Sequence, residues 1–115
     1  MAAQSLAADL SRANAALMAR YYDEVFNRRN LDFLRAHLHP EVVGHGPGAD
    51  DELRGIEAVV AFSAYVWEAY DDYRLTVEDI LADGDRVVVR GSVTAVHRST
   101  GRPVRFFGLT LYRVE

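Results

Sequence analysis

Hydrophobic side chains recur every three or four residues in the first part of the chain, which is the spacing of amphipathic helices. The first such stretch predicts a helix over Ser5–Asn27, which the polar residues that follow interrupt. Asn30 suits the N-cap of a second, short helix over Leu31–Leu38, which must stop before Pro40. A third helix is predicted over Gly55–Tyr70.

The third predicted helix is apolar nearly all the way round, so it must be covered on more than one side. We therefore expect it to lie against a sheet, with Phe62 and Trp67 largely buried and a concave cavity beneath it. Between the second and third helices, Val42–Val43 can begin a short strand before the glycines and the proline that follow require a loop.

The hydrophobic period changes to two after the third helix, which indicates strands. Three are predicted, over Tyr73–Ala82, Arg86–His97 and Arg102–Val114, with turns at Asp83–Gly84 and Ser99–Gly101. Helices followed by an antiparallel meander predict an α+β fold with the helices on one face of a curved sheet. The open mouth of such a sheet is a common kind of small-molecule site.

Composition limits what this fold can do. The 115 residues form one domain over 1–115, with a net charge of −4 and no basic face, so we expect no nucleic-acid partner. The absence of cysteine excludes disulfides and thiolate chemistry, and the absence of lysine excludes Schiff bases. No apolar run is long enough to span a membrane and no secretory signal is visible, so we expect a cytoplasmic protein without a membrane partner.

Histidines are the first candidates for proton transfer. His45 lies beside glycines where a strand meets a loop, and its imidazole can act as a general acid or base near neutral pH. Its alternative role is a hydrogen bond to a nearby backbone carbonyl. His37 and His39 are two residues apart and diverge in either a helix or a strand, so they cannot hold one metal ion. We expect His97 to be exposed beside its turn.

Aromatic residues are the candidates for the wall of a pocket for a flat apolar ligand. Trp67 and Tyr22 can serve either as core or as pocket wall, because both lie on helices that should roof the sheet. We expect the pairs Asp50–Asp51 and Asp71–Asp72 to be surface groups. The residues that we assign to substrate binding are Tyr22, Phe62, Trp67, Tyr70, Phe107 and Thr110.

The order of these elements resembles the nuclear transport factor 2-like superfamily and, within it, the SnoaL-like polyketide cyclase group. The resemblance runs from Leu17 to Glu115 and rests on YYDEVFNRRNLDFLRAHLHPEVVGHGPG, LRGIEAVVAF, YRLTVEDILADGDRVVVRGSVTAVH and TGRPVRFFGLTLYRVE. It implies a cone-shaped α+β barrel with a largely apolar pocket, commonly as a homodimer. Relatives bind or transform hydrophobic small molecules without a metal or an organic cofactor, by cyclisation, isomerisation or hydrolysis.

Two departures from the family pattern concern catalysis. Relatives often carry an aspartate just before the proline of the GHGPG segment, where this chain has Gly46. SnoaL-like cyclases also carry an aspartate on a further strand, which this sequence lacks because it stops at Glu115. Two hypotheses follow: an enzyme for a polyketide- or terpenoid-like substrate with His45 as the catalytic group, or a non-catalytic binding or dimerisation module of the same fold.

Overall fold

The computed structural model describes residues 2–45 and 52–115, and Gly46 and the pair Asp50–Asp51 lie outside the described residues. Helices come first and the long strands last, as predicted. The elements in chain order are α1 (Ala2–Tyr21), the π-helix η1 (Tyr22–Asn27), α2 (Leu31–His37), β1 (Val43–His45), β2 (Glu52–Arg54), α3 (Ile56–Ala69), β3 (Tyr70–Asp83), β4 (Arg86–His97) and β5 (Arg102–Arg113).

The first predicted helix is two elements rather than one. The α-helix ends at Tyr21, and the chain continues as a π-helix whose wider turns close through bonds such as Arg28 N–H to the Asp23 carbonyl, at 3.0 Å. Hydrophobic spacing does not distinguish these two helix types over six residues. The predicted cap of the second helix is confirmed, because the side chain of Asn30 accepts a hydrogen bond from Phe33 N–H at 3.1 Å.

The long strands form an antiparallel meander in the order β3-β4-β5, with β4 in the centre. Its first turn is bound to α1: the Gly84 N–H donates to Ser11 Oγ at 2.8 Å, and Asn14 Nδ2 donates to the Gly84 carbonyl at 2.7 Å. A second sheet consists of β1 and β2. Its second strand was not predicted, because three residues are too few for an alternating pattern.

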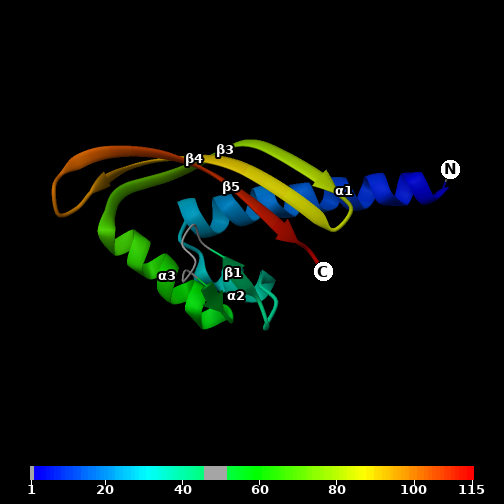
Figure 1. Cartoon of the computed structure of the whole chain (residues 1–115), viewed down its shortest axis with the longest axis horizontal. Helices are drawn as coiled ribbons and strands as arrows, with labels where there is room; N and C mark the ends of the chain where they lie inside the picture. Colours follow the sequence, from blue (N-terminus) through cyan, green and yellow to red (C-terminus); the bar gives the residue numbers. More distant parts are fainter. Residues whose placement is uncertain (1, 46–51) are drawn as a thin grey trace.

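The core lies between one face of the three-stranded sheet and the helices, which Figure 1 shows gathered on the same side of that sheet. Buried side chains of β4 alternate as expected for a central strand, with Val87, Val89, Val93 and Ala95 facing the helices. The α+β class with helices on one face of an antiparallel sheet is therefore confirmed. Among the described residues, no helix is long and apolar enough to cross a membrane.

Burial on α3 follows the prediction at one position and not at the other. Trp67 is 8% exposed, as expected, but Phe62 is 52% exposed, so its predicted burial is wrong. The helix buries one stripe, formed by Val60, Ser63 and Trp67. Phe62 and Tyr65 lie on another face of α3, which the described elements do not cover. Although the helix is apolar nearly all the way round, one of its apolar faces is therefore exposed.

Candidate functional site

A cavity of about 340 Å³ lies beneath α3, as the sequence predicts. Its walls come from η1, α3, β3 and β5, four elements that are distant in the chain. The lining residues are Phe26, Phe62, Ser63, Tyr65, Val66, Trp67, Tyr70, Tyr73 and Phe106. Seven of the nine are aromatic, so the cavity offers ring faces and edges to an apolar ligand and few polar groups to orient it.

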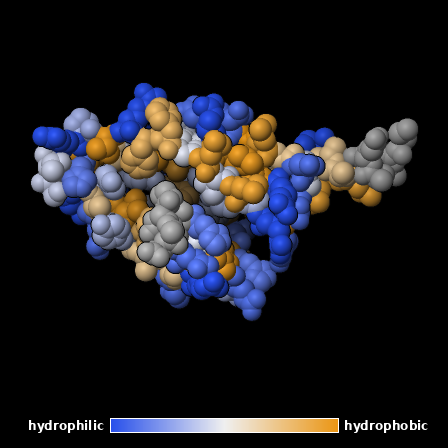
Figure 2. All heavy atoms as spheres, in the orientation of Figure 1, coloured by the Kyte–Doolittle hydropathy of each residue, from blue (hydrophilic) through white to orange (hydrophobic). Residues whose placement is uncertain are grey.

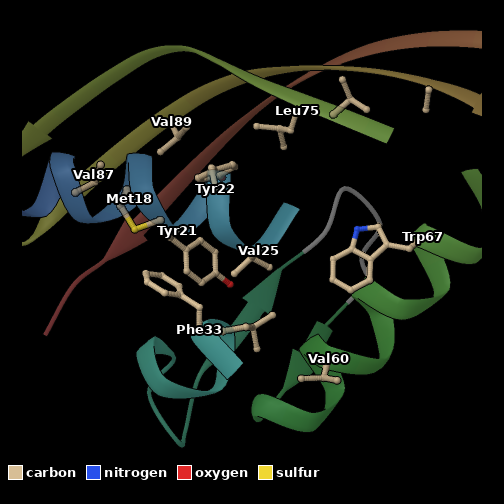
Figure 3. Packing of buried hydrophobic residues seen from close by; sticks show 13 residues of the cluster. Met18, Tyr21, Tyr22, Val25, Phe33, Val60, Trp67, Leu75, Val87 and Val89 are labelled. Carbon is tan, nitrogen blue, oxygen red and sulfur yellow. The ribbon is translucent and has the colours of Figure 1, made fainter. Parts of the chain in front are cut away.

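Trp67 is held on this wall by contacts on both its backbone and its ring. Arg98 donates from Nη2 to the Trp67 carbonyl at 3.3 Å and from Nε to Asp71 Oδ1 at 2.9 Å. The guanidinium of Arg29 lies 5.7 Å from the centre of the indole ring. Figure 3 shows the indole extending from α3 toward the core, with its nitrogen at the end farther from Val60. That nitrogen is buried and has no acceptor among the described residues.

Tyr73, on β3, adds a phenol to the lining of the cavity. Burial, together with the nearby phenols of Tyr22 and Tyr70, raises the pKa of Tyr73 to about 12. The hydroxyl therefore stays protonated near neutral pH and can donate a hydrogen bond. Tyr70 also lines the cavity, with its ring against Phe106 at 6.2 Å between centres and edge-on to His97 at 5.5 Å.

Two of the predicted binding residues, Tyr22 and Thr110, are not among the residues that line the cavity. Tyr22 is buried and stacks on Phe26, at 5.2 Å between ring centres, and its hydroxyl is hydrogen-bonded to that of Tyr112. Thr110 lies on β5 and is exposed. Burial is the main cause that raises the pKa of Tyr22 and of Tyr112. Tyr22 packs against Phe26 from within the core, so of the two roles left open for Tyr22 the structure shows the core role.

The other predicted wall residue on β5, Phe107, lies on the outer face of the sheet. It is 64% exposed, and the guanidinium of Arg105 lies 5.1 Å from its ring centre. Its neighbour Phe106 faces inward, opposite the buried Val93, and lines the cavity instead. The alternation of side chains along β5 indicates which phenylalanine faces inward. Phe106 is an even number of residues from Val104 and Tyr112, which pack against the core, so it lies on the same face as they do.

His45 lies at the end of β1, exposed and opposite Glu52 in the register of the small sheet. It is not among the residues that line the cavity, so the structure does not join the predicted acid–base group to the predicted binding residues. The other histidines have local partners. His37 Nδ1 lies 2.9 Å from the Phe33 carbonyl, and His39 Nε2 lies 3.3 Å from Glu115. Within residues 2–45 and 52–115, no three ligand side chains are close enough to hold a metal ion.

A family model described as the SnoaL-like domain matches residues 18–115. The chain belongs to this family. No significant match is found among curated protein sequences. The fold is shared with solved structures of low sequence identity.

One is a candidate SnoaL-like polyketide cyclase from Jannaschia sp. CCS1, with a TM-score of 0.83 and 23% identity over 92% of this chain and 79% of that one. A nuclear transport factor 2-like protein of unknown function from Burkholderia pseudomallei has a TM-score of 0.75 and 27% identity, over 89% of this chain and 82% of that one. An LEH-like epoxide hydrolase of Mycobacterium tuberculosis has a TM-score of 0.70 and 16% identity, over 95% of this chain and 71% of that one.

Sequence reasoning missed three features of this SnoaL-like domain. Phe26 and Tyr73 line the cavity, but in the sequence they are single aromatics in amphipathic patterns that equally suit the core. Arg29 lies in the turn after η1, with a positive φ of 56°, and its guanidinium lies over the indole ring of Trp67. That the N–H of Trp67 has no acceptor among the described residues depends on what surrounds the ring in three dimensions, and no local pattern indicates it.

Proposed function

We propose that this SnoaL-like domain binds a hydrophobic small molecule in the cavity beneath α3 and transforms it by acid–base chemistry without a cofactor. The observation that carries the proposal is the cavity itself: about 340 Å³, walled by aromatic rings from four elements. This volume lies near the lower end of the roughly 300–1,000 Å³ of small-molecule sites. A ligand of two or three fused rings, such as a polyketide or terpenoid, fits its size and its apolar lining.

The relatives support this class of ligand and reaction. A structural neighbour is a candidate polyketide cyclase and another is an epoxide hydrolase, and both share the fold of this chain. Both names imply proton transfer on an organic substrate. We therefore propose cyclisation, isomerisation or hydrolysis as the reaction, with Phe62, Trp67 and Tyr70 in contact with the substrate and His45 as the proton-transfer group.

One observation favours a second candidate, a module that binds the same ligands without transforming them. Among the described lining residues there is no carboxylate, imidazole or other group that is basic near neutral pH. A proton beside a carbonyl needs such a base within hydrogen-bond reach. Catalysis then depends on His45 approaching the ligand from the end of β1, whereas binding alone needs nothing beyond the cavity.

Exchange of carbon-bound hydrogen for deuterium separates the two candidates without a known natural substrate. The probe is 1-tetralone, a two-ring ketone, and the readout is loss of its proton signal beside the carbonyl in deuterated buffer. The enzyme proposal expects faster exchange with the protein, reduced by about 10²–10⁴-fold in His45→Ala and unchanged in the control His39→Ala. Binding of 1-tetralone with no accelerated exchange would favour the binding module, and equal rates in His45→Ala would remove His45 from the reaction.

We further propose that the domain is a homodimer that buries the outer face of its three-stranded sheet. Four large apolar side chains on that sheet are between 61% and 70% exposed: Leu81, Phe107, Leu109 and Leu111. Figure 2 shows hydrophobic residues gathered where Figure 1 places the sheet. Exposed apolar patches of this kind commonly mark interfaces, and a two-fold axis would pair the patch with itself.

A further inference from the structure

The indole N–H of Trp67 is a buried donor without an acceptor among the described residues, and it belongs to a residue that lines the α3 cavity. Buried donors are nearly always paired, because a lost hydrogen bond to water is otherwise not replaced. An unpaired buried donor destabilises the folded protein. The position therefore needs a physical reason, and the neighbouring cavity provides one.

The ring cannot easily turn to find another partner. The backbone of Trp67 is fixed by the bond from Arg98 to its carbonyl, and Arg29 lies against the face of the ring. Arginine over an indole face is a favourable contact that resists rotation of the ring. The donor is thus held in one direction before any ligand is present, which reduces the entropy that a ligand must lose to use it.

We propose that the Trp67 N–H is the point that orients the ligand, by donating a hydrogen bond to a carbonyl or ether oxygen of an otherwise apolar molecule. This inference rests on the proposed use of the cavity. The nitrogen is buried, so such a ligand reaches it only when side chains of the cavity lining move aside. Two of these lining side chains, Phe62 and Tyr65, are more than half exposed. A neutral oxygen fits better than a carboxylate, because no cationic side chain lines the described cavity.

A pair of ligands that differ only at the oxygen tests this directly. 1-Tetralone carries a carbonyl where tetralin carries a methylene group. Trp67 is the only tryptophan of the chain, so its indole gives a single ¹H–¹⁵N resonance. Binding of 1-tetralone should move the indole proton downfield, as a new hydrogen bond does, whereas tetralin should bind without that shift.

Affinities add a second readout. The preference for 1-tetralone over tetralin, taken as a ratio of Kd values, should fall by about 3–10-fold in Trp67→Phe, the size of one net hydrogen bond. The matched variant Tyr73→Phe removes a buried phenol donor of the cavity lining and should leave most of the preference. Equal indole shifts with both ligands, or a preference that persists in Trp67→Phe and disappears in Tyr73→Phe, would overturn the inference but leave the cavity as the binding site. Absence of any binding would overturn the proposed function and this inference with it.

Discussion

Asn27 connects the helical layer to the sheet, and its replacement should destabilise the whole domain. Its side chain makes two hydrogen bonds to the backbone of one residue of β3: Nδ2 donates to the Leu75 carbonyl and Oδ1 accepts from the Leu75 N–H, both at 2.8 Å. β3 is an edge strand of the sheet, so these bonds occupy backbone groups that no neighbouring strand pairs. Leu75 is buried against the core at this point.

The magnitude follows from the two bonds and from what their loss leaves behind. Each net hydrogen bond is worth about 1 kcal/mol, and a buried backbone group left unpaired costs about 1–3 kcal/mol. Water can reach part of this edge, so we expect Asn27→Ala to lower the free energy of unfolding by about 2–4 kcal/mol, out of a total of about 5–15 kcal/mol. The midpoint of thermal unfolding should fall by roughly 10–15 °C for a domain of this size.

Denaturant unfolding followed by circular dichroism measures the change. Asn27→Asp is the matched variant: it keeps the shape and the acceptor but turns a carboxylate toward the Leu75 carbonyl, so it should cost at least as much near neutral pH. The control Arg12→Ala, at an exposed ion pair on α1, should change stability by less than about 0.5 kcal/mol. A loss below about 0.5 kcal/mol in Asn27→Ala would refute the reasoning, because water would then replace both bonds without cost.

Three further predictions concern protonation, assembly and local structure. The pKa of Tyr21 and that of Tyr73 are each raised to about 12, so the folded state keeps two protons that the unfolded state loses above pH 10. The free energy of unfolding should therefore be unaffected by these groups below pH 10 and fall between pH 10 and 12, by about 1.4 kcal/mol per pH unit for each retained proton. Unfolding curves at pH 9 to 12 measure this, and a flat profile would contradict it. Leu109→Asp should convert the proposed dimer into monomers in sedimentation experiments, whereas Leu6→Asp, at an exposed position of α1, should not; a monomeric wild type would disprove the dimer. Asn30→Ala should cost about 1 kcal/mol by removing the cap of α2, measured by chemical unfolding, and no change would mean that the cap bond contributes nothing.

Periodicity was sufficient for most of the fold because long elements repeat their pattern several times. The strands Arg86–His97 and Arg102–Arg113 and the helix Ile56–Ala69 lie within one or two residues of their predicted bounds. Short or irregular elements carry too few repeats. The pairing of β1 with β2 and the π-helical turn over Tyr22–Asn27 therefore emerged only in the structure.

The site was predicted less completely, because a pocket depends on which side of an element is left uncovered. Trp67 and Tyr70 line the cavity as expected. On β5 the lining residue is Phe106 and not the predicted Phe107, because adjacent residues of a strand face opposite sides and Phe107 lies on the outer face. Tyr22 appeared equally suited to the pocket and to the core until the structure placed it against Phe26 within the core. Sequence patterns identify aromatic residues of a core, but they do not show which rings border empty space.

Whether the cavity beneath α3 binds apolar small molecules can be measured by chemical-shift mapping with 1-tetralone. Aromatic and methyl resonances of the protein are followed during titration. The account predicts saturable shifts at Phe26, Trp67, Tyr73 and Phe106, which four different elements bring together around the cavity. Shifts confined to the outer face of the sheet, at residues such as Leu109 and Leu111, or no saturable shift at all, would contradict it.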